Sequence, residues 1–251
     1  GPSAFVPPST SVMSQTVSQS YADRLAVTLP EVRARIEAAA VPCGRSPGDV
    51  RLVAVTKSHP FEAVEAALEA GLTDLGENRV SELEEKVAAF GRDAVRWHMI
   101  GHIQSRKARR AAEVAHLIHS VDSAKLGEKL ARAAAEDGRV VPVLAQVNTS
   151  GEASKSGFTP ERALDEIHAL AELPGLRVSG LMTMAPFVDD EVVLGRAFQG
   201  LRSLSERLIS SGAAVGPELS MGMTNDLEIA IREGSTMVRI GTALFGERGG
   251  T

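Results

Sequence analysis

The sequence predicts a closed (β/α)8 TIM barrel with one extra helix before its first strand. Short apolar runs alternate with amphipathic stretches from Val50 onward, and the alternations match the eight strand–helix units of such a barrel. The length of 251 residues also suits one barrel. The alternative is an open, doubly wound sheet, but no G-x-G-x-x-G turn follows the first predicted strand. We therefore expect the closed barrel.

The predicted strands are short runs rich in aliphatic and β-branched side chains. They are expected at residues 51–56, 73–75, 95–100, 117–121, 140–147, 176–182, 218–221 and 237–240. Helical spacing of apolar residues predicts helices at 60–70, 79–90, 107–114, 123–136, 160–172, 191–211 and 225–232. The extra helix is expected at 22–40, packed across the bottom or the side of the barrel.

The N-terminal segment differs in composition from the rest of the chain. Residues 1–20 are rich in Ser, Thr, Val and Pro, and they lack the basic and continuous apolar regions of a signal peptide. We interpret them as a flexible tail, in which Gly1 and Pro2 are typical of a remnant of tag cleavage. Residues 21–251 are then expected to form a single domain.

The overall charge argues against two classes of partner. The formal net charge is −5, so no broad basic surface favours nucleic acid or an anionic membrane. No apolar stretch approaches the ~20 residues that are needed to span a bilayer. The 43% hydrophobic and 24% charged residues are a usual balance for a globular protein, and they can support a large core.

Cysteine and histidine residues argue against a metal site. Cys43 is the only cysteine, which excludes an intrachain disulfide and a cysteine-based metal cluster, and a reducing cytoplasm is the expected compartment. His98 and His102 flank the end of the third predicted strand without a carboxylate at ligand spacing. We interpret both histidines as structural or pocket-lining residues and expect no metal.

Lys57 stands at the end of an apolar strand, where lysine is unusual. Strand alternation places Val53, Val55 and Lys57 on one face. If that face is the barrel interior, the amine reaches the C-terminal mouth, where barrel active sites lie. Desolvation and nearby cations lower a lysine pKa from its usual ~10.4 and favour Schiff-base formation with an aldehyde. The alternative is a strand-end lysine that reaches into solvent.

The last predicted strand and its neighbour carry the second signal. Alternation sets Arg239 opposite Val238 and Ile240, so its guanidinium is expected to point into the barrel. Gly241 and Thr242 then offer close backbone approach, amide groups and a hydroxyl. The loop that begins at Ser220 contains small residues and leads into a helix, and the loops after strands seven and eight form the usual phosphate site of a barrel.

Closure of the barrel brings these signals together. The first strand lies beside both the eighth and the second, so Lys57, Arg239, Thr242 and Ser220 share one sector of the mouth, and Asn78 joins them from the loop after the second strand. An amine, a phosphate cradle and a buried cation in one pocket describe a site for pyridoxal 5′-phosphate (PLP).

Six motifs in order along the chain carry a family resemblance. They are Val53-Ala54-Val55-Thr56-Lys57, Gly76-Glu77-Asn78-Arg79, the run from Trp97 to Ser105 (WHMIGHIQS), Ser120-Val121-Asp122, Leu219-Ser220-Met221-Gly222-Met223 and Val238-Arg239-Ile240-Gly241-Thr242. From about residue 50 to residue 246 the chain resembles the YggS/PROSC family of pyridoxal-phosphate homeostasis proteins. One departure follows Ser105, where Arg106-Lys107 replaces the family's usual Asn-Lys; it leaves the cofactor site untouched.

The resemblance implies a PLP fold type III barrel, similar to the N-terminal domain of alanine racemase. It implies that Lys57 carries the aldimine and that Arg239 lies near the pyridine nitrogen. It also implies the phosphate ligands Ser220, Gly241 and Thr242, with Asn78 and Met221 as further pocket residues.

The residues favour a carrier or regulator of PLP over an enzyme. An arginine stays charged and donates to an unprotonated pyridine nitrogen, which weakens the electron sink that PLP chemistry needs. Racemases of this fold use a second base, a tyrosine from another domain, whereas the only tyrosine here is Tyr21, at the edge of the presumed tail. We expect PLP storage, delivery or regulation by a monomer, with apo forms of PLP-dependent enzymes as acceptors. The alternative is an amino-acid racemase or lyase that uses Lys57.

Overall fold

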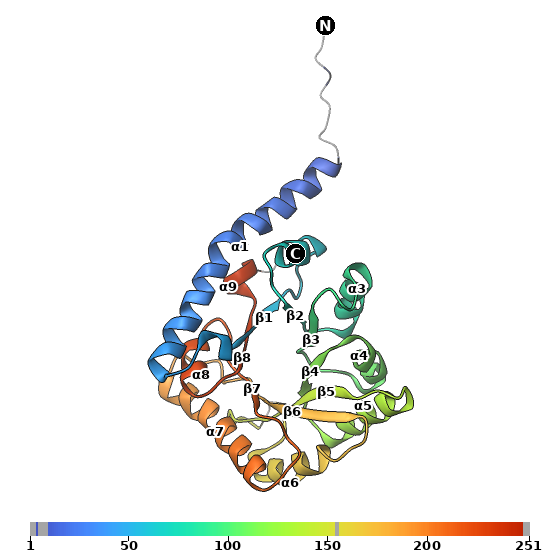
Figure 1. The fold of residues 1–251 in the computed structure, drawn as a ribbon, viewed down its shortest axis with the longest axis vertical. Coiled ribbons are helices and arrows are strands. Elements are labelled where there is room, and N and C mark those ends of the chain that lie inside the picture. Colours follow the sequence, from blue (N-terminus) through green and yellow to red (C-terminus); the bar gives the residue numbers. More distant parts are fainter. Residues whose placement is uncertain (1–3, 5–9, 154–155, 248–251) are drawn as a thin grey trace.

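The computed structural model describes residues 4, 10–153 and 156–247, and it forms the closed parallel barrel that the sequence predicts (Figure 1). Each strand pairs with the next, and β8 pairs with β1 to close the ring. The strands are β1 Arg51–Val55, β2 Asp74–Glu77, β3 Arg96–Met99, β4 Leu117–Val121, β5 Val141–Gln146, β6 Leu176–Met182, β7 Glu218–Ser220 and β8 Met237–Ile240.

Helices surround the barrel, and they agree with the predicted ones to within two residues at each end. They are α2 Phe61–Glu69, α3 Val80–Phe90, α4 Ala108–Val114, α5 Ala124–Glu136, α6 Pro160–Leu170, α7 Glu191–Ser210 and α8 Leu227–Arg232. Short 3-10 turns lie at Val41–Cys43, Pro47–Asp49 and Ser105–Lys107. A further four-residue helix, α9 Thr242–Phe245, follows β8 and was not predicted from the sequence.

Side-chain caps explain where two of these helices begin. The Ser123 hydroxyl accepts a hydrogen bond from the backbone N–H of Leu126, which satisfies a free donor at the start of α5. The Asp190 carboxylate accepts from the N–H of Val192 at the start of α7. Both helices then present an apolar stripe to the barrel.

The extra helix α1 spans Thr10–Ala40 and lies along the side of the barrel, against α2, α8 and α9 (Figure 1). Leu25, Leu29, Val32 and Ile36 recur at helical spacing and are buried against the barrel, which explains the position of the helix. The predicted start at residue 22 was wrong, because the helix already includes residues 10–20 of the presumed tail. Residues 1–3 and 5–9 of that tail lie outside the described residues.

Alternation along the strands divides the buried side chains between two sides of the sheet. Ala54 belongs to the large cluster between the sheet and the helices, whereas Val53 and Val55 form a separate cluster with Ile100. A Cβ atom on Gly76 of β2 would also meet Val53 and Ile100. Val53 and Val55 therefore face the barrel interior, as predicted.

No helix among residues 4, 10–153 and 156–247 combines the length and the hydropathy that crossing a bilayer requires.

Gly180 lets β6 pack closely against the backbone of β7. A Cβ atom at this position would lie 2.0 Å from the carbonyl oxygen of Glu218, its partner residue in β7. We expect Gly180→Ala to lower the free energy of unfolding by about 3 kcal/mol, because the backbone of β7 must move. The measurement is urea unfolding followed by circular dichroism.

The matched control is Gly195→Ala in α7, where a Cβ atom meets nothing within 4 Å. This change is expected to leave stability unchanged or to raise it by up to about 1 kcal/mol, because alanine favours helix. Equal stability of the two variants would contradict the predicted constraint.

Candidate functional site

The residues singled out by the sequence lie on, or just after, the C-terminal ends of β1, β2, β7 and β8. Val55 of β1 pairs with Gly76 of β2, and Ala54 pairs with Ile240 of β8. Lys57 lies two residues after the last residue of β1, Val55, and is partly exposed. Asn78 directly follows β2 and is also partly exposed. The barrel therefore brings the ends of these strands together in one sector.

Arg239 points into the barrel, as alternation predicted, and its side chain is almost fully buried at 2% exposure. One terminal nitrogen, Nη1, donates to the Ser220 hydroxyl at 2.6 Å, and the other, Nη2, donates to the Thr183 carbonyl at 3.0 Å. Burial lowers its pKa to about 10, against an opposing effect of the Asp226 charge. The guanidinium therefore stays charged at neutral pH and has N–H groups beyond these two bonds for a ligand.

A chain of buried side chains leads away from Arg239 through the barrel interior. Ser220 Oγ lies 2.8 Å from His119 Nδ1, and His119 Nε2 lies 2.8 Å from His98 Nδ1. His98 Nε2 lies 2.8 Å from Asp74 Oδ1. All five residues are at most 2% exposed. His98 was expected to be a structural or pocket-lining residue, whereas the sequence pattern did not predict a role for His119 or Asp74.

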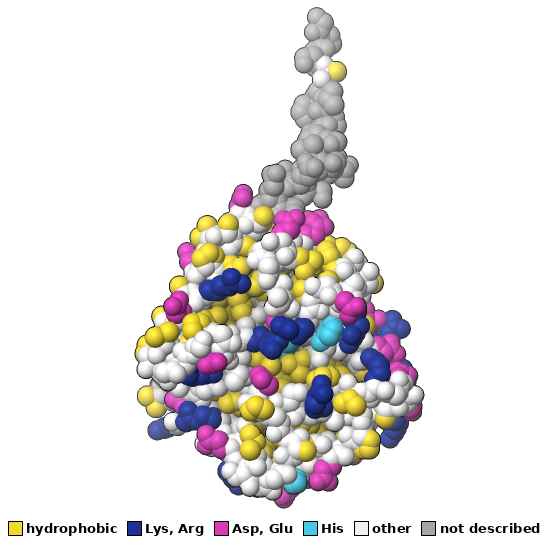
Figure 2. All heavy atoms as spheres, viewed as in Figure 1, with side chains coloured by type: hydrophobic (Ala, Val, Ile, Leu, Met, Phe, Trp, Pro, Cys, Tyr) yellow, Lys and Arg dark blue, Asp and Glu magenta, His cyan; other side chains and the backbone are white. Residues whose placement is uncertain are grey.

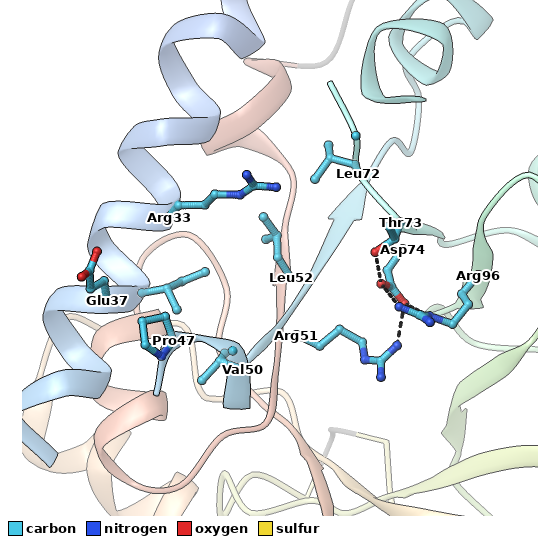
Figure 3. A pocket seen from close by; sticks show the side chains of 13 residues that line it. Arg33, Glu37, Pro47, Val50, Arg51, Leu52, Leu72, Thr73, Asp74 and Arg96 are labelled. Carbon is cyan, nitrogen blue, oxygen red and sulfur yellow. Dashed lines mark hydrogen bonds and ion pairs between the residues drawn. The ribbon is translucent and has the colours of Figure 1, made fainter. Parts of the chain in front are cut away.

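The Asp74 end of the chain lies at the N-terminal end of the barrel. Arg51 and Arg96, at the starts of β1 and β3, donate to its carboxylate at 2.9 to 3.1 Å (Figure 3). Burial alone would raise the pKa of Asp74, but hydrogen bonds from His98, Arg96 and Thr73 outweigh it, and the pKa lies well below its usual range. Asp74 is therefore ionised at neutral pH.

An open cavity of about 480 Å³ reaches this carboxylate from outside the barrel. Figure 3 shows Asp74 and Arg96 on one side of it and Arg33 of α1 on the other. On the face drawn in Figure 2, basic side chains form small groups separated by acidic, apolar and neutral ones.

Two hydroxyl groups meet at the predicted phosphate site. The Thr242 hydroxyl, after β8, lies 3.3 Å from the Thr224 hydroxyl in the loop after β7. In the same loop the Asp226 carboxylate accepts from the backbone N–H of Met223 at 2.6 Å. Gly241 is the residue between β8 and Thr242 and is partly exposed. Thr224 was not among the predicted site residues, although its place in the loop of small residues after β7 is a signal for it.

Ser220 and Met221 lie deeper than the other predicted ligands. The Ser220 hydroxyl is fully buried between His119 and Arg239. Met221 is also fully buried, and its side chain packs in the large cluster between the sheet and the helices. Its backbone N–H donates to Met237, and its carbonyl accepts from Ser235. The structure therefore does not bring the Met221 side chain to the mouth.

A second buried cluster supports the strand end that carries Lys57. The Lys86 ammonium donates to the Thr56 carbonyl at 2.9 Å and to the Glu77 carboxylate at 2.5 Å. Burial raises the pKa of Glu77, although Lys86 and the Thr56 hydroxyl oppose this effect. These bonds hold the backbone next to Lys57 from behind the sheet. Within the described part of the chain, no group of three or more His, Cys, Asp or Glu side chains could hold a metal ion.

The alanine racemase N-terminal domain is the family whose model matches residues 27–249. The curated pyridoxal phosphate homeostasis protein of Vibrio alginolyticus is 42% identical over 210 residues, which cover 82% of this chain and 90% of that protein. The protein of the same name from Escherichia coli K12 is 40% identical over 236 residues, which cover 89% of this chain and 97% of that protein.

Solved structures with similar folds include a PLP-binding relative and an alanine racemase. PipY of Synechococcus elongatus, solved with PLP bound, matches with a TM-score of 0.76 at 35% identity and covers 90% of this chain and 100% of its own. An alanine racemase of Clostridium difficile matches with a TM-score of 0.74 at 16% identity, covers 91% of this chain and 58% of its own, and shows the fold alone. The chain belongs to the alanine racemase N-terminal domain family and, within it, to the family of pyridoxal phosphate homeostasis proteins.

Proposed function

We propose that this protein binds PLP through Lys57 and acts in PLP homeostasis, by storage, delivery or regulation of the cofactor, without turnover of its own. The observation that carries the proposal is the buried Arg239 of β8, which pairs with β1, the strand that leads into Lys57. The names of relatives at about 40% identity and the PLP bound to PipY support it.

The residues at the mouth fit the three parts of the cofactor. Lys57 offers an amine for its aldehyde, and Arg239 offers N–H groups to the pyridine nitrogen. Thr242 and Thr224 offer hydroxyl groups to the phosphate, together with the backbone at Gly241. Ser220 fits a different role, because its hydroxyl already bonds Arg239 and His119.

Arg239 also favours a carrier over an enzyme. When bound, PLP supplies an electron sink that depends on a protonated pyridine nitrogen. The Arg239 guanidinium can only donate hydrogen bonds, and it stays charged at neutral pH. With PLP bound, Arg239 would hold the ring nitrogen in its unprotonated form, which would strengthen binding and weaken the electron sink.

The alternative is a PLP-dependent amino-acid racemase or lyase, and one contact favours it. The Tyr21 hydroxyl lies 2.8 Å from His59 Nδ1, two residues after Lys57 in the chain. A tyrosine–histidine pair beside this loop is a candidate second base.

We further propose a monomer in the cytoplasm that passes PLP to apo forms of PLP-dependent enzymes. The lone Cys43 is exposed and not paired in a disulfide, which fits a reducing compartment. Gel filtration of the PLP-loaded protein, alone and mixed with a PLP-free aminotransferase, measures both the assembly state and the transfer.

Lys57→Ala is expected to abolish the covalent attachment of PLP. Purified protein mixed with PLP should show a visible absorption band that borohydride bleaches, and mass spectrometry should find the phosphopyridoxyl group on Lys57. The control is Lys125→Ala, an exposed lysine of α5, which should keep both signals. A stable adduct on another lysine, with Lys57 unmodified, would overturn the assignment.

Thr242→Val is expected to weaken PLP binding about tenfold, because a hydrogen bond to a charged group contributes about 1.5 kcal/mol or more. Pyridoxal, which has no phosphate, is the matched ligand, and its affinity should change by less than twofold. Titration of both aldehydes by absorbance gives the two affinities. An equal loss for both would place Thr242 away from the phosphate.

The PLP-loaded wild-type protein is expected to show no sustained turnover with a panel of L-amino acids, because the ring nitrogen stays unprotonated beside Arg239. Racemisation and elimination are measured by chiral chromatography and by keto-acid release. Turnover that disappears in both Lys57→Ala and Tyr21→Phe would establish the racemase or lyase alternative.

A further inference from the structure

The chain of Asp74, His98, His119 and Ser220 crosses the barrel interior and ends on Arg239. Its four contacts measure 2.8, 2.8, 2.8 and 2.6 Å. Binding of PLP as proposed above uses only the Arg239 end. Burying so many polar side chains costs free energy unless each one is hydrogen-bonded. We therefore ask which role the buried residues beyond Arg239 have.

The protons of this chain have one consistent arrangement. The ionised Asp74 carboxylate can only accept, so His98 donates from Nε2. The neutral His98 ring then accepts at Nδ1, which makes His119 Nε2 the donor. His119 accepts at Nδ1, so the Ser220 hydroxyl donates to it and presents its lone pairs to Arg239. Every donor in the chain therefore points toward Asp74.

The surroundings keep both histidine rings neutral. Burial lowers the pKa of His98 and lowers that of His119 further, and the only opposing charge is that of Asp74. A protonated His119 would also direct an N–H group at the Ser220 hydroxyl. The charged and titratable groups around the two rings are Asp74, Arg51, Arg96, His116 and Arg239, and the Asp226 charge acts on Arg239.

The neutral chain decides how Arg239 is held. The Arg239 guanidinium has two hydrogen-bond acceptors. The backbone carbonyl of Thr183 can only accept, whereas the Ser220 hydroxyl can rotate and either donate or accept. The acceptor nitrogen of His119 removes that freedom, because it binds the hydroxyl proton and leaves the lone pairs facing Arg239. Without His119 the hydroxyl has no fixed orientation, and Arg239 loses one of two anchors.

We propose that Asp74, His98 and His119 are positioning residues that act through Ser220 to fix the Arg239 guanidinium against the pyridine nitrogen of PLP. The inference rests on the proposed function, since it assigns the residues that control the same site. It extends the site from the C-terminal mouth to the N-terminal end of the barrel, where Arg51 and Arg96 keep Asp74 ionised.

The test compares two substitutions of His119. In His119→Gln the amide can donate to His98 and accept from Ser220, so PLP affinity should stay within about threefold of wild type. In His119→Leu both bonds are lost. Affinity should fall about tenfold, and the pH at which the absorption band of bound PLP changes should rise by about one unit, because the ring nitrogen protonates more readily.

Ser220→Ala separates positioning from general packing. If His119 acts through Ser220, then His119→Leu should add little to Ser220→Ala in the double variant. Additive losses of affinity, or an unchanged pH midpoint in His119→Leu and Ser220→Ala, would overturn the inference. If His119→Leu does not fold, the pH midpoints of Ser220→Ala and His119→Gln are compared instead. A raised midpoint in Ser220→Ala alone supports the inference, and equal midpoints overturn it.

Nitrogen NMR of the histidine rings tests the chain without the cofactor. Both buried rings should show the neutral Nε2–H form in the PLP-free protein from neutral to mildly acidic pH. A protonated ring or the other tautomer would refute the arrangement. If wild-type protein forms no absorption band with PLP, the proposed function fails and this inference fails with it. A normal wild-type band with unaffected variants removes this inference alone.

Discussion

The burial of one charged guanidinium inside the barrel is the constraint on which the site depends. Arg239 is 2% exposed, and its bonded partners in the described part of the chain are a hydroxyl and a carbonyl group. A buried charge is costly unless hydrogen bonds replace its hydration. The Ser220 hydroxyl and the Thr183 carbonyl provide them from β7 and from the end of β6. A ligand with an acceptor atom at the mouth would provide a further one.

A buried carboxylate, Asp74, lies at the other end of the interior. The Asp74 carboxylate is already paired with two exposed arginines, Arg51 and Arg96, at the starts of β1 and β3. Between Asp74 and Arg239 stand only neutral groups, whose hydrogen bonds all run in one direction. Such bonds polarise one another, so each end of the chain favours the charge at the other. The two histidines therefore matter as neutral donors and acceptors, not as bases.

The sequence predicted which side chains face the barrel interior, because this depends on alternation along each strand. It did not predict contacts between strands, because these depend on strand register. Alternation of side chains along each strand placed Arg239 and Val53 inside the barrel, and the regular alternation of strands and helices predicted the closed sheet. The contact between His98 and His119 depends on the stagger of β3 against β4, where His98 lies opposite Leu117. The early start of α1 was missed because the Ser- and Thr-rich composition of residues 10–20 was interpreted as that of a tail. The family resemblance named Met221, but its side chain lies in the core.

In the proposed role, affinity and chemical inertness come from the same residue. A partner for the pyridine nitrogen must donate if it is to bind the unprotonated ring, and the arginine guanidinium stays charged, donates and does not accept. An aspartate at this position would bind the protonated ring and activate it. The neutral chain behind Arg239 is consistent with this choice, since it offers the site no proton at neutral pH. A barrel of the racemase type can therefore hold an aldehyde cofactor tightly while contributing little to its reactions.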